Sequence, residues 1–95
     1  MSASIDVHLP TTLRHYCEIH SPVSVDAVDI QSALEDLQRN YPSLYQSICD
    51  ETGTVRRHIN LFVNATWVPV SDAGGLAMQL KQGDVLTIWP AVSGG

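Results

Sequence analysis

The residues whose chemistry stands out are the two glycines that end the chain, Gly94 and Gly95. A side chain at either position would crowd a protein that closes around the terminal carboxylate. Glycine removes this obstacle and also adopts backbone angles that are closed to other residues. A carboxylate is a poor electrophile, so acyl transfer from Gly95 requires a partner enzyme that activates it with ATP, for example as an acyl-adenylate. We therefore interpret this ending as a substrate handle.

The residues just before this ending are typical of a β-strand. Between Val85 and Trp89, β-branched and aromatic side chains alternate with Leu86 and Ile88, which is the period of a half-buried strand. Pro90 has no backbone donor, so we expect the strand to stop there. Residues 1–89 are predicted to form one domain. Residues 90–95 are predicted to form a tail that spans at most roughly 20 Å.

Two stretches of the chain resemble the MoaD/ThiS family of ubiquitin-like sulfur carriers. The first is Gly83-Asp84, the alternating strand and the ending Pro-Ala-Val-Ser-Gly-Gly, and the second is His58–Asn64, similar to a central strand and its "VN" turn. The resemblance implies an α+β fold of the β-grasp (ubiquitin-like) type. Such a fold has a mixed sheet of about five strands, with the first and last strands central and parallel and one main helix packed on one face. It also implies that sulfur is carried as a terminal thiocarboxylate.

The resemblance further implies the partners and the role of each site residue. A ThiF- or MoeB-like adenylating enzyme would use ATP to activate Gly95, the covalent carrier. A persulfide or sulfide donor would then displace AMP, and an acceptor synthase would take the sulfur. Gly94 would give clearance, Ala91 and Val92 would be recognised by the activating enzyme, and the sheet face near Phe62 would dock partners. Phe62 has an alternative interpretation as core or edge packing.

The pathway that receives the sulfur stays open between several alternatives. The shortest thiamine-type carriers lack the long segment seen here at Tyr41–Arg57. This chain is more similar to the carriers of thiocarboxylate-dependent cysteine or thio-metabolite biosynthesis, with molybdopterin synthase small subunits as the second choice. A ubiquitin-like protein modifier, conjugated through Gly95 to lysines, is another class. A binding module with an incidental tail is a third.

Hydrophobic periodicity predicts the elements that hold these residues in place. The clearest is a helix that begins after Asp29 as its N-cap and ends before Pro42. Its apolar stripe consists of Ile30, Ala33, Leu34, Leu37 and Tyr41. Strands are predicted at Ser4–Leu9, within Cys17–Val25, at His58–Asn64 and at Trp67–Val70. The other predictions are turns at Thr11–Tyr16, Asn64–Thr66 and Lys81–Asp84, a loop at Ser71–Gly75, and helical turns near Leu44–Ile48 and Leu76–Leu80.

Composition limits the partners that this chain can have. Its 95 residues suit one domain, and its net charge of −5 with no basic stripe argues against nucleic acid and suits docking on a basic enzyme patch. No apolar run is long enough to span a membrane, and Met1–Val7 has no secretory pattern. Cys17 and Cys49 lack CxxC spacing, so we expect free thiols in a reducing cytoplasm, with Cys49 buried.

The chain offers no catalytic constellation of its own. The four histidines are scattered, and His15 with Cys17 falls short of the three or four ligands of a metal site. Asp72–Gly75 lacks the spacing of a nucleotide-binding loop. We therefore expect a carrier that is not an enzyme, with no catalytic residue, no metal and no intrinsic cofactor, and with ATP used only by the activating enzyme.

Overall fold

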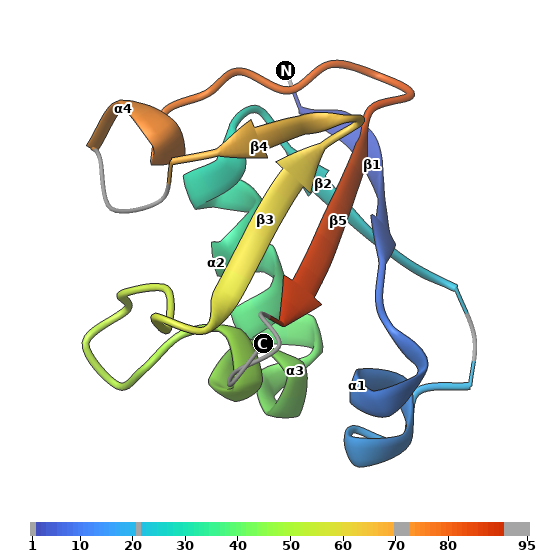
Figure 1. The fold of residues 1–95 in the computed structure, drawn as a ribbon. Coiled ribbons are helices and arrows are strands. Elements are labelled where there is room, and N and C mark those ends of the chain that lie inside the picture. The colour runs from blue at the N-terminus through green and yellow to red at the C-terminus, as the bar shows by residue number, and fades with distance from the viewer. Residues whose placement is uncertain (1, 21, 70–72, 91–95) are drawn as a thin grey trace.

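The computed structural model describes residues 2–20, 22–69 and 73–90 of the chain. In this part, five strands form one mixed sheet in the order β2-β1-β5-β3-β4 (Figure 1). The strands are β1 (Ala3–His8), β2 (Val23–Ala27), β3 (Ile59–Val63), β4 (Thr66–Val68) and β5 (Val85–Pro90). The first and last strands, β1 and β5, run parallel, and the other neighbours are antiparallel. This arrangement confirms the α+β β-grasp prediction, including the central position of β5.

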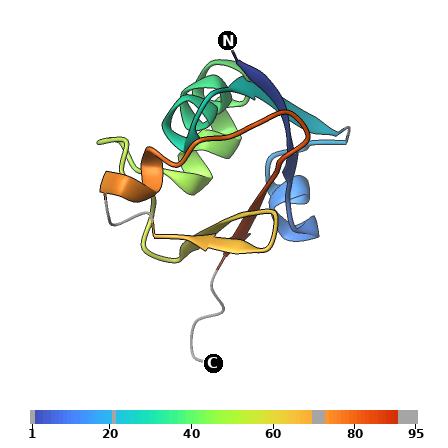
Figure 2. The same cartoon turned by 90° about the horizontal axis from the view of Figure 1, so that it is seen from above.

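The main helix packs on one face of this sheet. The helices are α1 (Thr11–Tyr16), α2 (Ile30–Asn40), α3 (Pro42–Ile48) and α4 (Ala73–Leu76). Asp29 caps α2, since its carboxylate accepts from the Ser32 amide at 2.8 Å while the Asp29 amide donates to the Ser32 hydroxyl at 3.2 Å. Figures 1 and 2 both show α2 and α3 on one side of the strands.

The core lies between these helices and the sheet. All four predicted stripe residues within α2 are buried, and Tyr41 follows as its half-buried C-cap. The two apolar residues of α3 are also buried. Alternate strand residues complete the core, which includes Ile5, Val7, Val23, Val25, Ile59, Leu61, Val63, Leu86 and Ile88. The remaining residues of each strand, which alternate with the core residues, face away from the helices. The sheet therefore has one face covered by helices and one open face.

Four predictions of local structure were wrong or displaced. Thr11–Tyr16 is the helix α1 instead of a turn; it buries no residue, so no hydrophobic period marks it. The helical turn predicted over Leu76–Leu80 lies earlier, as α4, which ends at Leu76 and includes residues 73–75 of the predicted loop. The second strand is only Val23–Ala27. Pro90, assigned above to the tail, ends β5 opposite Ile59, because a strand terminus tolerates a residue without a donor.

The turn that starts β5 is held by a buried carboxylate. Asp84 is 6% exposed and accepts from the Lys81 amide at 3.0 Å and from the Asn64 side-chain amide at 3.2 Å. The Asn64 side-chain oxygen in turn accepts from the Val85 amide at 3.1 Å. Gly83 has a φ of 92°, which suits glycine, so the Gly83-Asp84 pair of the sequence both forms the turn and joins it to the β3–β4 turn.

We expect Asp84→Asn to lower the melting temperature at neutral pH, and to lower it by a smaller amount at acidic pH. The hydrogen bonds from Lys81 and Asn64 lower the pKa of the Asp84 carboxyl, so its ionised form stabilises the fold. That stabilisation is present above the unfolded pKa of about 3.9 and is lost as the pH falls through the lower folded value. Thermal melts at neutral pH and in acid below that value would test this, with Asp6→Asn as an exposed control. A difference in melting temperature that does not change with pH would contradict it.

Candidate functional site

The tail begins at the end of the sheet's central strand. β5 lies between β1 and β3, and Pro90, its last residue, pairs in register with Ile59 at the start of β3. The predicted carrier Gly95 and the predicted recognition residues Gly94, Val92 and Ala91 all lie outside the described residues. The described part of the chain therefore includes Pro90, the residue to which the tail is attached, and the surfaces around it.

One of these surfaces is a cluster of aromatic side chains on the open face of the sheet. Phe62, the predicted docking residue, is half-buried on this face and pairs with Trp67 on β4. Trp89 on β5 pairs with Asn60 on β3, and the two tryptophans are 53% and 52% exposed. The Trp67 indole nitrogen donates to the Asn60 side-chain oxygen at 3.2 Å, which fixes that ring. We call Phe62, Trp67 and Trp89 the aromatic face.

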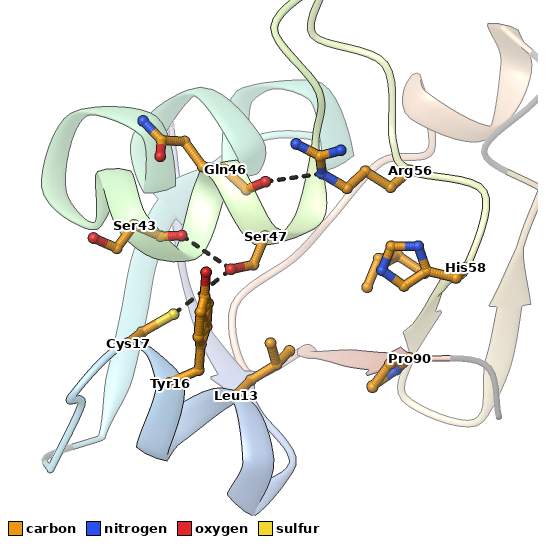
Figure 3. A pocket seen from close by; sticks show the side chains of 10 residues that line it. Leu13, Tyr16, Cys17, Ser43, Gln46, Ser47, Arg56, His58 and Pro90 are labelled. Carbon is orange, nitrogen blue, oxygen red and sulfur yellow. Dashed lines mark hydrogen bonds between the residues drawn. The ribbon is translucent and has the colours of Figure 1, made fainter. Parts of the chain in front are cut away.

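A second surface is a groove of about 660 Å³ beside Pro90. Its walls come from four segments that are far apart in sequence: α1 with its C-cap, α3, the residues from Arg56 to the start of β3, and the end of β5 (Figure 3). The ten residues that line it are Leu13, Tyr16, Cys17, Ser43, Gln46, Ser47, Arg56, His58, Ile59 and Pro90. We call this cavity the exit groove, because Pro90, the last residue of β5 and the last described residue, lies on its edge.

Hydrogen bonds fix the polar walls of the exit groove. The Arg56 side-chain Nε donates to the Gln46 carbonyl at 2.9 Å, and the Arg56 amide donates to the Ile48 carbonyl at 2.8 Å. These bonds fasten the segment before β3 to the last turn of α3, where free carbonyls accept donors. Where α1 meets α3, the Cys17 sulfur lies 3.8 Å from the Ser47 hydroxyl, which donates to the Ser43 carbonyl at 3.1 Å.

The two cysteines are free and differ in their surroundings. Cys17 is half-buried at the exit groove, whereas Cys49 is 1% exposed, as predicted for a packing residue. Burial raises the pKa of the Cys49 thiol to about 11, against a smaller lowering by its hydrogen bond with Tyr45. Cys49 is therefore protonated at neutral pH and is not a nucleophile there.

The described residues hold no constellation for metal chemistry. Within residues 2–20, 22–69 and 73–90, no group of three His, Cys, Asp or Glu side chains is placed to hold a metal ion. Nor does this part of the chain contain a helix of the length and hydrophobicity that crossing a membrane requires.

Sequence reasoning found only part of these surfaces. It selected Phe62, but Trp67 and Trp89 join it only through the register of three strands, which periodicity does not give. The exit groove was missed because its walls meet only in the folded chain. Its one sequence signal was the cluster Arg56-Arg57-His58, which is too short to indicate a nucleic-acid surface.

Several known proteins are similar to this chain in sequence and in fold. The model of the ThiS family matches residues 7–95. The sulfur carrier protein CysO of Mycobacterium tuberculosis is 34% identical over 94 residues, which cover 97% of this chain and 99% of that protein. The Amycolatopsis orientalis BexX/CysO complex contains a similar chain, with a TM-score of 0.76, 31% identity and coverage of 96% and 99%. SAMP1 from Haloferax volcanii has a TM-score of 0.78, 26% identity and coverage of 98% and 100%.

Proposed function

This chain belongs to the ThiS family and is a sulfur carrier with a β-grasp fold, and we propose that Gly95 carries the sulfur as a terminal thiocarboxylate. The observation that carries the proposal is the position of β5. The central strand leads through Pro90 directly into Ala-Val-Ser-Gly-Gly, and the family match continues to residue 95. The carrier is in this proposal a substrate of partner enzymes and catalyses nothing itself.

The proposed chemistry takes place on a ThiF- or MoeB-like adenylating enzyme. A Gly95 carboxylate oxygen attacks the α-phosphorus of ATP, and pyrophosphate leaves, which gives an acyl-adenylate. Sulfide then attacks the carbonyl carbon, the bond to AMP breaks, and AMP leaves with the electron pair. If the donor is a persulfide, the same attack gives an acyl disulfide, and a second thiol must reduce it to release the thiocarboxylate. The carrier itself needs no cofactor in this scheme.

The tail residues have separate roles in this proposal. Gly94 leaves space for the enzyme wall next to the reacting carboxylate, since a side chain there would meet any closely fitting channel. Ala91 and Val92 offer small apolar side chains to the same channel. We place this exchange in the cytoplasm, a reducing compartment that suits two unpaired cysteines.

We further propose that the aromatic face docks the adenylating enzyme. Large, exposed aromatic side chains are common anchors of interfaces, because they bury much area at a small entropic cost. Phe62→Ala and Trp67→Ala should each raise the Kd for that enzyme about tenfold or more, without a comparable loss of thermal stability. Ser24→Ala, at an exposed position of β2, serves as the control. Folded variants that bind as tightly as the wild type would exclude this docking role.

The pathway supplied is proposed to be cysteine or thio-metabolite biosynthesis. The support is the similarity to CysO, a sulfur carrier, and to the CysO chain found in a complex with BexX. An acceptor synthase would take the sulfur in either case. The alternative is that the acceptor is a molybdopterin synthase. Measuring the binding of this chain to a molybdopterin synthase and to an acceptor synthase of cysteine or thio-metabolite biosynthesis would decide between them.

A second candidate function is protein modification through Gly95. The similarity to SAMP1, whose relative in Methanosarcina acetivorans is described as a small archaeal modifier protein, favours it. Lys81 is the single lysine, so the chain offers one site for building chains of itself. Isopeptide-linked Gly-Gly remnants on cellular proteins would support this function, and their absence from cells that express the chain would exclude it.

The experiment that tests the carrier proposal is intact-mass spectrometry. The full chain is incubated with a ThiF- or MoeB-like adenylating enzyme, ATP and sulfide. We expect a mass gain equal to the replacement of one oxygen by sulfur, located in the C-terminal peptide. A reaction without ATP is the control. An unchanged mass with enzymes of both types would contradict the proposal.

A further inference from the structure

The exit groove has a charge opposite to that of the whole protein. The chain has ten acidic and five basic residues, yet Arg56 and His58 line the groove and no acidic side chain does. Arg57 lies between them in sequence and is exposed. An acidic protein thus places the Arg56 guanidinium beside Pro90, the last residue of its central strand.

Neither Arg56 nor Arg57 forms an ion pair with any described residue. Arg56 also lines a neighbouring pocket with Asp50 and Glu51, and its charge helps to lower the pKa of the Asp50 carboxyl. The Arg56 guanidinium is already held by the bond from Nε to the Gln46 carbonyl, so its terminal NH₂ groups are positioned before a partner arrives. A preorganised guanidinium loses little entropy when a carboxylate binds, which makes it effective in recognition.

Apolar side chains form the rest of the groove. Leu13, Ile59 and Pro90 contribute its apolar lining, and Figure 3 shows Tyr16 and Leu13 across the cavity from Arg56 and His58. Tyr16 is 74% exposed at the end of α1, a helix that buries no residue. An exposed tyrosine next to a cationic groove gives an apolar anchor beside a charged contact.

We propose that the exit groove receives an acidic loop of the adenylating enzyme. This loop carries an apolar side chain and lies at the mouth of the enzyme channel that accepts residues 91–95. The inference rests on the proposed function. Pro90 is both part of the groove and the residue before the tail, so a protein that encloses the tail from residue 91 must come against the groove. Arg56 and Arg57, which form no ion pair with a described residue, favour negative charge on that protein, and the apolar lining with Tyr16 favours an apolar side chain.

The arginines and Tyr16 should affect different rate constants. Charges at the rim of an interface mainly accelerate association, and salt screens that effect. A buried aromatic anchor mainly slows dissociation. We therefore expect salt-dependent association through Arg56 in the groove and the exposed Arg57 next to it in sequence, and slow dissociation through Tyr16.

The test measures binding kinetics between the full chain and a ThiF- or MoeB-like adenylating enzyme with ATP. Arg56→Gln/Arg57→Gln is compared with Arg39→Gln/Lys81→Gln, a control that removes the same charge away from the groove. At low salt we expect the groove pair to slow association about tenfold and the control pair less than twofold. At about 0.5 M salt the difference should disappear. Tyr16→Ala should raise the dissociation rate constant about fivefold or more.

The single variant Arg57→Gln is also measured, because Arg57 does not make the hydrogen bonds to α3 that Arg56 makes. It keeps the test valid if the double variant has a lowered melting temperature. Equal slowing by the two double variants would overturn the proposal, since net charge alone would then explain the effect. Wild-type binding kinetics in the folded groove variants would also overturn it. Normal adenylation of the same variants would show that the carrier function still holds. Failure of the wild-type chain itself to bind would count against both.

Discussion

A chain shortened by Gly95 is expected to give no thiocarboxylate with the adenylating enzyme, ATP and sulfide, while it melts at the temperature of the full chain. The shortened carboxylate would lie about 3.5 Å from its proper position, and a misplacement of even 1 Å can cost about 100-fold in rate. Folding should not change, because the buried core residues in the described part of the chain all lie between Ile5 and Ile88. Intact mass and a thermal melt on the same sample check both parts.

Gly94→Ala is the matched variant, because it keeps the length and adds one methyl group. We expect an unchanged melting temperature and slower adenylation, measured as pyrophosphate release. A shortened chain that still gains sulfur would mean that Gly95 is not the carrier. A large fall in the melting temperature of either variant would mean that the tail contributes to the fold.

Leu37→Ala should have the opposite pattern, with a large loss of stability and little direct effect on the reaction. The Leu37 side chain is 0% exposed in the centre of α2, where it packs between helix and sheet. Its removal is expected to lower the free energy of unfolding by about 2–5 kcal/mol, through lost burial and the cavity left behind. Urea denaturation followed by circular dichroism measures this value.

The neighbouring Gln38→Ala is the control, because Gln38 is exposed on the same helix and should change stability by less than about 0.5 kcal/mol. Below its melting temperature, the Leu37→Ala protein should still gain sulfur at Gly95. Equal stability of the two variants would show that the helix stripe does not form the core.

The predicted elements that proved correct are those whose burial repeats along the chain. The α2 stripe, the alternation in β1 and the alternation in β5 each recur over enough residues to be visible in sequence. α1 and α4 lack this signal because α1 buries nothing and α4 has four residues. Short helices of this kind are determined by tertiary contacts, which sequence periodicity does not contain.

The candidate surfaces were harder to predict than the elements, because they depend on register and on long-range contacts. Phe62 was selected from its own strand, whereas Trp89 joins it only because β5 lies beside β3 in a particular register. The exit groove brings Tyr16 to the same cavity as Arg56, forty residues further on. The roles of Ala91, Val92, Gly94 and Gly95 stay predictions.

The position of β5 also bears on how this protein is made. With β5 absent, the order β2-β1-β5-β3-β4 leaves two separate antiparallel pairs, β1 with β2 and β3 with β4. A two-stranded pair of this size is only marginally stable in water, so the sheet can form only after the last strand, β5, has been synthesised. A ribosome that stops before Val85 therefore releases a chain that lacks both the tail and the strand needed to fold. Such a chain cannot occupy a partner enzyme as a folded but sulfur-incompetent inhibitor.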